Sequence, residues 1–269
     1  MTVRVPTITL PRGAAQTAGY AVSDALALAW RNLLTIRRVP QLLIFATIQP
    51  LLFVLMFRYV FGGAIHVPGV DYVNYLMPGI FAQTVAFGAI STGIGLAVDK
   101  DTGLIERLHS LPMARSAVLA GRTLADLTRN VFVVTLMVAV GFAVGFRIET
   151  SAARLVLGVL LLLLFGFALS WVFALIGLSV ANAESAQAAS FPFMMPMVFA
   201  SSAFVSTATM PGWLQAFAEH QPLTAAVDAM RTLVLGGSAT GPVLESLAWS
   251  LGILLVFVPL AVTRYRRGA

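Results

Sequence analysis

Long apolar runs alternate with short polar connections along most of this chain. Six runs are long enough to cross a bilayer, which takes about 20 residues. They cover residues 40–61, 76–98, 118–146, 155–181, 187–207 and 244–263. The fourth run is the clearest, because LVLGVLLLLLFGFALSWVFALIGL holds no charged residue. The pattern predicts an all-α integral membrane protein with six transmembrane helices.

A short charged segment, DKDTGLIERLHSLPMARS, separates the second run from the third. Apolar side chains share one face of a helix predicted over 102–111, namely Leu104, Ile105, Leu108 and Leu111. Charged positions fall elsewhere on the helix, and Pro112 ends it. Such a helix either fills a groove on a partner protein or rests its apolar face in lipid. The spacing does not decide between these two roles.

A second amphipathic stretch, 20–38, precedes the first run. Apolar side chains recur there at helical spacing, with charged ones on another face. The stretch predicts an interfacial helix that lies flat on the cytoplasmic leaflet, with a water-exposed cytoplasmic helix as the alternative. Its candidate contact residues are Trp30, which suits the headgroup level, and Arg31, Arg37 and Arg38.

Residues 208–240 lie between the fifth and sixth runs. Pro211 and Pro222 bracket one short helical stretch, and a second ends before two glycines at 236–237. Each is about half the length of a spanning helix. We therefore expect two re-entrant helices at 211–235 that dip into the outer leaflet and return.

The orientation of the spans follows from the placement of lysine and arginine. With six spans, 13 of these residues fall on the side of both termini and 4 on the other side. Positive residues collect on the cytoplasmic side of membrane proteins. Both termini are therefore predicted to be cytoplasmic, with 1–39 as a cytoplasmic segment and 40–269 as the six-span membrane domain.

The composition agrees with a membrane protein. Of 269 residues, 59% are hydrophobic and only 10% are charged, against about 25% charged in soluble domains. The net charge of +6 does not indicate nucleic-acid binding, because the positive residues sit at the ends of apolar runs. The absence of cysteine excludes disulfides and thiolate metal sites.

Sequence motifs for chemistry are lacking. The three histidines are scattered, and neither a zinc-protease nor a serine-hydrolase motif occurs. Lys100 is the only lysine and does not belong to a phosphate-binding loop, so any ATP must be hydrolysed by another polypeptide. Asp126 is the best candidate for ion coupling. Because Arg122 and Arg129 flank it at helical spacing, a local ion pair is the favoured interpretation.

Two blocks resemble a known family. GLIERLHSLPMARSAVLAGRTLAD, at 103–126, resembles the cytoplasmic segment of type 2 ATP-binding-cassette exporter permeases, roughly G-x-x-E-R-L-x-x-L-P-x-x-R. MPGWLQAFAEHQPLTAAVDAMRTLVLGG, at 210–237, resembles the outer re-entrant pair of the branch containing the daunorubicin/doxorubicin-resistance permeases. The fitting positions are Gly103, Glu106, Arg107, Leu108, Leu111, Pro112 and Arg115, then Pro211, Trp213, Pro222, Leu223, Asp228, Arg231 and Gly237.

The resemblance implies a permease subunit, not an enzyme, of an exporter of lipophilic drugs or lipid-like molecules in the plasma (inner) membrane. It implies two paired permeases, identical or sister chains, each bound to a cytoplasmic ATPase that handles ATP and Mg. No cofactor or metal is expected in this chain. The ATPase contacts would be the interfacial helix and the coupling helix, with Leu104, Ile105, Glu106, Arg107, Leu108, Leu111, Pro112 and Arg115. The outer gate would hold Pro211, Trp213, Pro222, Asp228 and Arg231.

Adaptable apolar and amide side chains in three spans suit a path for a lipophilic substrate. They are Phe45, Gln49, Phe53, Phe81, Gln83, Phe87, Phe193, Met194 and Met197. The alternative is ordinary helix packing or contact with membrane lipids. The competing functions are a lipid or glycan exporter of the same architecture, an ion-coupled secondary drug transporter, and a membrane scaffold.

Overall fold

The computed structural model describes residues 41–63, 69–105 and 115–266. The expected interfacial helix, with Trp30, Arg31, Arg37 and Arg38, lies outside the described residues. The same holds for 106–114, which includes Glu106, Arg107, Leu108, Leu111 and Pro112 of the expected coupling helix.

All secondary structure in the described ranges is helical. A first helix, α2 (Gln41–Leu55), continues into the π-helical turn η1 (Met56–Val60). The long helices are α3 (Tyr72–Asp101), α5 (Arg115–Ala143), α6 (Ala152–Ser179) and α10 (Thr240–Arg266). The shorter ones are α7 (Ala183–Phe199), η2 (Thr207–Thr209), α8 (Gly212–Glu219) and α9 (Pro222–Leu235). The predicted all-α class is therefore confirmed for this part of the chain.

Local sequence signals set several of these helix ends. Ser151 accepts a hydrogen bond from the backbone of Arg154 and caps α6, and Asn182 does the same for Ser185 at the start of α7. Pro222 occupies the first turn of α9, where a missing N–H is harmless. At the other end of α6, the ammonium of Lys100 donates to the carbonyl of Val180 at 3.2 Å.

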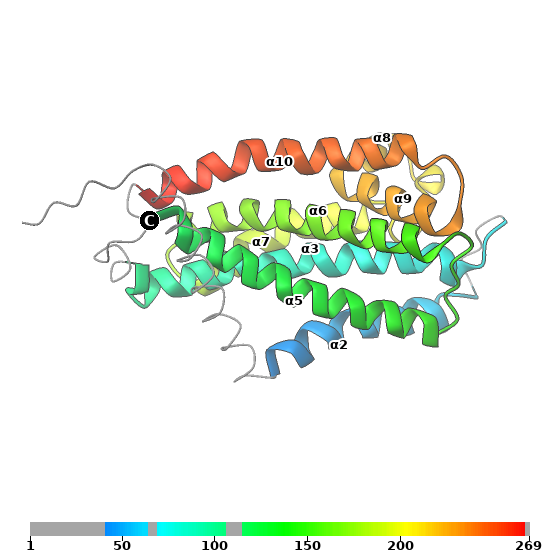
Figure 1. The fold of residues 1–269 in the computed structure, drawn as a ribbon, viewed down its shortest axis with the longest axis horizontal. Helices are drawn as coiled ribbons and strands as arrows, with labels where there is room; N and C mark the ends of the chain where they lie inside the picture. Colours follow the sequence, from blue (N-terminus) through cyan, green and yellow to red (C-terminus); the bar gives the residue numbers. More distant parts are fainter. Residues whose placement is uncertain (1–40, 64–68, 106–114, 267–269) are drawn as a thin grey trace, which may run out of the picture.

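The helices run along one common direction, with α3 at the centre (Figure 1). It packs against α6 most extensively and also against α2, α5, α7 and α9. The next layer is formed by α10, which packs on α6 and α9. The short helices α8 and α9 lie at the end of the bundle opposite the C-terminus (Figure 1).

The contact between α3 and α6 depends on two glycines. A Cβ atom at Gly93 would clash with the carbonyl of Phe173, and a Cβ atom at Gly177 would clash with the carbonyl of Gly93. The two backbones therefore touch where neither helix has a side chain, as small residues allow in membrane proteins. This contact fixes the position of α3, which supports the rest of the bundle.

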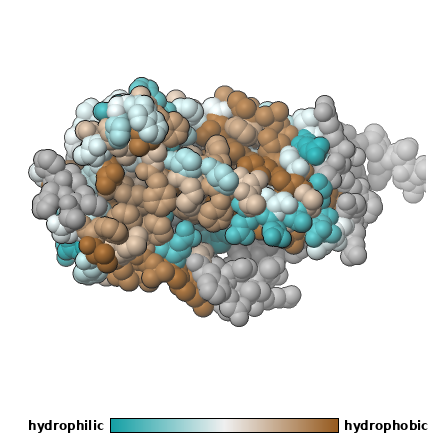
Figure 2. Space-filling model, turned by 180° about the vertical axis from the view of Figure 1, so that it is seen from behind, coloured by the Kyte–Doolittle hydropathy of each residue, from teal (hydrophilic) through white to brown (hydrophobic). Residues whose placement is uncertain are grey.

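The surface is apolar over much of its area. Figure 2 shows broad hydrophobic regions on one face, broken by smaller polar patches. Large apolar side chains are exposed on several helices, including Leu52, Phe132, Leu157, Phe193 and Leu255. Such an extent of exposed apolar surface is what contact with lipid requires.

Four helices in the described part are long and apolar enough to cross a membrane: Tyr72–Asp101, Gly121–Ala143, Ala152–Ser179 and Thr240–Arg266. The first predicted run is a shorter apolar helix over Ala46–Val60. The fifth was predicted to reach residue 207, but α7 ends at Phe199. Its end is explained by Gln221, whose amide donates to the carbonyls of Met197 and Ala200 at 2.8 and 2.6 Å. The count of six spans stays a prediction.

Substitution of Gly177 by alanine should separate α3 from α6. Overpacking of a close helix contact destabilises a protein by about 1–3 kcal/mol, so the thermal unfolding midpoint of the purified protein should fall clearly. Gly252→Ala is the matched control, because Gly252 lies in α10 with open space around the position of a Cβ atom. Equal midpoints for both variants would show that the glycine contact is unimportant.

Candidate functional site

A cavity of about 400 Å³ lies between α2, α3 and α5. Twelve residues line it: Ala46, Gln49 and Pro50 from α2; Gln83, Thr84, Phe87, Gly88, Ser91 and Ile94 from α3; and Arg129, Asn130 and Val133 from α5. Its volume lies in the range of small-molecule pockets, which are mostly apolar with a few convergent polar groups. Three residues predicted for the substrate path, Gln49, Gln83 and Phe87, meet here.

Arg129 brings a positive charge to the wall of this cavity. Its guanidinium donates to the carbonyl of Gly88 at 2.7 Å and to the hydroxyl of Ser91. The hydroxyls of Ser91 and Thr84 themselves donate hydrogen bonds to backbone carbonyls of α3. These contacts fix the hydroxyls and the guanidinium in place at one side of the cavity.

Two buried amide side chains belong to the cavity wall, and an oxygen of one of them has no hydrogen-bond partner among the described residues. Gln83 is 2% exposed and Asn130 is 5% exposed, and Oε1 of Gln83 has no partner there. A buried amide without a partner costs about 1–3 kcal/mol of stability. A bound molecule or a water molecule can supply the missing partner. These amides are therefore the groups best placed to bind a polar part of a ligand.

A chain of alternating charges connects Arg129 to one end of the bundle. Asp126 lies 3.5 Å from Arg129 and 3.8 Å from Arg122, and Arg122 lies 3.0 Å from Asp99. The hydroxyl of Thr92 donates to Asp126 at 2.6 Å. The predicted local ion pairs of Asp126 are therefore confirmed.

Space for this charge chain comes from Gly95 of α3. A Cβ atom at Gly95 would overlap the guanidinium of Arg122. The missing side chain lets the arginine lie against α3 on its way to Asp99. Since two acidic and two basic side chains take part, the chain has no net charge, which is how charges persist inside a membrane protein.

The other predicted path residues whose side chains the structure describes do not line this cavity. Phe53 stacks with Phe57 and Phe204 in an aromatic cluster near the end of α2. The other described path residues pack against neighbouring helices. Phe81 contacts Phe146, Phe193 contacts Phe173, and Met194 and Met197 belong to the buried core. The side chain of Phe45 lies outside the described part. An apolar side chain in a span is equally suited to core and path, so the sequence could not separate them.

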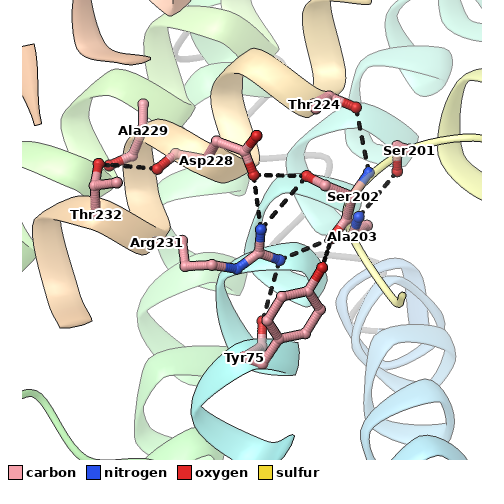
Figure 3. Close-up of polar contacts among 9 residues, drawn as sticks. All are labelled: Tyr75, Ser201, Ser202, Ala203, Thr224, Asp228, Ala229, Arg231 and Thr232. Carbon is pink, nitrogen blue, oxygen red and sulfur yellow. Dashed lines mark hydrogen bonds and ion pairs between the residues drawn. The ribbon is translucent and has the colours of Figure 1, made fainter. Parts of the chain in front are cut away.

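A second polar site occupies the end of the bundle where α8 and α9 lie. Arg231 of α9 donates to Asp228 at 2.7 Å and to the carbonyl of Ser202 at 2.7 Å (Figure 3). Its guanidinium carbon also lies 3.8 Å from the centre of the Tyr75 ring, a cation–π contact. The arginine thus joins α9 to α3 and to the segment after α7.

The segment after α7 is held on several sides. The hydroxyl of Ser202 donates to Asp228 at 2.7 Å, and its backbone N–H donates to Thr224 at 3.2 Å. The hydroxyls of Tyr72 and Tyr75 donate to backbone carbonyls of the same segment at 3.3 and 3.1 Å (Figure 3 shows the Tyr75 contact). Side chains from α3 and α9 thereby satisfy a non-helical backbone, as burial at membrane depth requires.

The residues predicted for an outer gate split into two groups. Asp228 and Arg231 meet in the network described above, and Pro222 begins the helix that carries them. Pro211 and Trp213 stand apart at the start of α8, where Trp213 is 77% exposed. An exposed tryptophan beside a proline suits the membrane interface.

Among the candidate ATPase contacts at the coupling helix, the structure describes Leu104 and Ile105, together with the backbone of Arg115, where α5 begins. Leu104 is half-buried. Ile105 is only 2% exposed and belongs to an apolar cluster with Leu119 and Trp171. This burial does not support the predicted contact of Ile105 with a partner, because the side chain faces its own bundle.

Several site residues were not found from the sequence. These residues are scattered along the sequence, and they come together only through the packing of the helices. They are Asn130, Thr84, Ser91, Tyr75 and Ser202. One available signal was the pair Arg129–Asn130, two polar residues in succession within an apolar run. In the described part of the chain, no group of three or more histidine or acidic residues could hold a metal ion.

Comparison with known proteins identifies the family. Residues 24–235 match the ABC-2 type transporter family. The chain is 35% identical over 246 residues to the daunorubicin resistance ABC transporter permease protein DrrB1 of Streptomyces coeruleorubidus, covering 91% of this chain and 87% of that protein. It is 29% identical over 226 residues to the probable doxorubicin resistance ABC transporter permease protein DrrC of Mycobacterium tuberculosis, covering 83% and 81%. Its helices, its apolar surface and these matches agree, and the chain is a transport permease that belongs to the ABC-2 type transporter family.

Proposed function

We propose that this chain is the permease subunit of an exporter that moves lipophilic drugs or lipid-like molecules out of the cell. A separate ATP-binding-cassette ATPase supplies the energy. The proposal is supported by the names of the related permeases and by the cavity between α2, α3 and α5. The cavity is the observation that carries it, since aromatic, aliphatic and amide side chains there surround a volume of drug size.

The substrate occupies this cavity during transport. Phe87 and Val133 supply apolar surface, and the amides of Gln83 and Asn130 supply hydrogen bonds. Gln49 is exposed on α2, so that helix forms the side at which the cavity opens. A movement of α2 away from α3 and α5 would release the substrate.

The charge chain gives the ATPase a mechanical route to the cavity. Asp99 lies in the last turn of α3, directly before the expected coupling helix, and Arg129 lies in the cavity wall. Force applied to the coupling helix reaches both α3 and α5. The ion pair between Asp99 of α3 and Arg122 of α5, the bond from Thr92 to Asp126 and the bond from Arg129 to Gly88 keep these helices in register, so that they move as a unit.

The arginine network at the opposite end serves as the outer gate. Arg231 ties α9 to Tyr75 on α3 and to Ser202. Opening requires these contacts to break together, and their re-formation closes the exit. Trp213 holds α8 at the outer surface of the membrane.

The assembly contains two permeases, as the same chain or as sister chains, in the plasma membrane with six spans each. Both termini are cytoplasmic, in agreement with the distribution of lysine and arginine. The ATPase contacts the interfacial helix (Trp30, Arg31, Arg37 and Arg38) and the coupling helix, with Ile105 anchoring the latter to the bundle. ATP and Mg bind only to that ATPase.

An ion-coupled transporter is the weaker alternative. Such a protein needs an ionisable group that exchanges its proton or ion near mid-membrane. Asp126, the best candidate, already contacts two arginines and a threonine hydroxyl. These contacts hold the carboxylate against neighbouring side chains of α3 and α5, which leaves it poorly placed to bind a transported ion.

Filling the cavity should block export. Ala46 lines it, so Ala46→Phe is expected to reduce ATP-driven efflux of the neutral fluorescent probe N-phenyl-1-naphthylamine at least about fivefold, a loss of about 1 kcal/mol in binding. Efflux is measured from cells that express the permease with its ATPase. The matched control is Ala248→Phe, at an exposed position of α10. Unchanged efflux in a correctly folded Ala46→Phe protein would contradict the assignment of the cavity.

Removing the guanidinium of Arg231 should weaken the outer gate. Arg231→Met loses the charged hydrogen bonds to Asp228 and Ser202 and should lower the free energy of unfolding by about 2 kcal/mol. Export should fall as well, and Arg231→Lys should recover only part of it, since lysine lacks the planar fork. Thermal unfolding and probe efflux are the measurements. Arg154→Met, an exposed arginine, is the control, and an equal effect there would refute the gate.

The contact with the ATPase can be tested by co-purification from membranes. Glu106→Ala and Leu108→Asp should each reduce the ATPase recovered with the permease about tenfold, because each removes a side chain expected at the contact. Glu184→Ala, at an exposed position at the start of α7, should leave recovery unchanged. Normal recovery with both coupling-helix variants would show that the ATPase binds elsewhere.

A further inference from the structure

Two hydroxyl groups in the cavity wall already use their hydrogens inside the protein. Thr84 donates to the carbonyl of Ile80 at 2.7 Å, and Ser91 donates to the carbonyl of Gly88 at 2.6 Å. A hydroxyl has one donor and two acceptor sites. These two side chains can therefore accept a further hydrogen bond from a ligand but have no hydrogen left to donate.

The charged side chain of the lining is engaged in a similar way. Arg129 donates to the carbonyl of Gly88 and to the hydroxyl of Ser91, and it lies 3.5 Å from the carboxylate of Asp126. The carboxylate compensates the charge of the guanidinium. A molecule in the cavity therefore lies beside a neutral ion pair, and hydrogen bonds rather than charge set the preference of the cavity.

Gln83 differs from these residues because its oxygen is unused. The side chain comes from α3, lines the cavity and is 2% exposed, and its Oε1 has no partner in the described part of the chain. The terminal torsion of a glutamine is soft, so the oxygen can turn toward a bound molecule. Gln83 is therefore an acceptor that a ligand can satisfy.

We propose that Gln83 determines the specificity of this cavity, which selects lipophilic molecules that carry an N–H or O–H group. The inference rests on the proposed function, since it names a chemical feature of the substrate in the same cavity. A donor on the ligand bonds to the oxygen of Gln83, while Phe87 and Val133 cover the apolar body. A molecule of the same shape without a donor leaves this buried oxygen unpaired.

Recognition through the other end of the same amide is the opposing possibility. The NH2 group of Gln83 could donate to an acceptor on the ligand. The oxygen of the amide would then stay buried without a partner in the complex. Because an unpaired buried acceptor costs more than one neutral hydrogen bond contributes, a donor on the ligand gives the more stable complex.

A pair of neutral probes that differ at one atom tests this preference. N-phenyl-1-naphthylamine carries an N–H between its two ring systems, and phenyl 1-naphthyl ether has an oxygen atom in that place. Full-length protein in phosphatidylcholine nanodiscs is titrated with the fluorescent amine, and the ether is added as a competitor. Nanodiscs without protein give the background from lipid.

The wild-type protein should bind the amine about tenfold more tightly than the ether, since the ether cannot donate to the buried oxygen. Gln83→Leu should bring the two affinities within about twofold, and its thermal unfolding midpoint should not fall, because the lost oxygen had no partner. Gln83→Glu lacks the NH2 group but keeps an acceptor oxygen, so it should retain the preference. Gln187→Leu, at an exposed position of α7, should leave both affinities unchanged.

Equal or tighter binding of the ether by the wild-type protein would overturn the inference, and this comparison needs no variant to fold. An unchanged preference in a folded Gln83→Leu protein, or its loss in a folded Gln83→Glu protein, would overturn the role of the oxygen. ATP-driven efflux of the amine separates the two proposals. Efflux without a donor preference would retain the exporter and reject the selectivity, and a donor preference without efflux would do the reverse.

Discussion

The interface between α3 and α5 is the constraint on which the functional part of this permease depends. Four charged side chains meet there in the order Asp99, Arg122, Asp126 and Arg129. Isolated charges in a bilayer are expensive, and pairing them is effective only if every member has its partner. Across the interface, Asp99 of α3 pairs with Arg122 of α5, Thr92 donates to Asp126, and Arg129 donates to Gly88 and Ser91. These contacts hold the two helices in one register and hold Arg129 at the wall of the cavity.

The opposite side of α3 is built differently. Gly93 lets the backbone of α3 touch that of α6, whose Gly177 faces it. One helix therefore carries a close apolar contact on one side and a polar, hollowed interface on the other. The first makes α3 a fixed reference in the bundle, and the second leaves room for a ligand against α2 and α5. At the far end of the same helix, Tyr75 supports Arg231 and links the cavity-bearing helix to the short helices α8 and α9.

Much of the fold followed from short-range signals in the sequence. Apolar runs located the long helices, and the spacing of Arg122, Asp126 and Arg129 along one helix indicated their ion pairs. Each of these features depends on residues within about one or two helical turns. The resemblance of two short blocks to exporter permeases indicated the family, which the comparisons confirm.

The features that could not be predicted from the sequence depend on contacts between distant segments. Thr92 donates to Asp126 across 34 residues, and Arg231 meets the backbone of Tyr75 across 156. Hydropathy alone predicted that the fifth run continues past Phe199. The structure ends α7 there, where the amide of Gln221, from a later segment, donates to the carbonyls of Met197 and Ala200. Composition also could not place Phe81 in the core and Phe87 at the cavity, since both are phenylalanines of one helix.

The most direct test of the account is protection of a cavity cysteine by a substrate. The natural chain has no cysteine, so Val133→Cys introduces a single thiol into the cavity wall, and Ala248→Cys provides one on the exposed surface of α10. The rate of labelling by a membrane-permeant maleimide is measured with and without N-phenyl-1-naphthylamine. The account predicts slower labelling at 133 and an unchanged rate at 248. Equal rates at 133 with and without the probe, at a concentration that supports efflux, would contradict it.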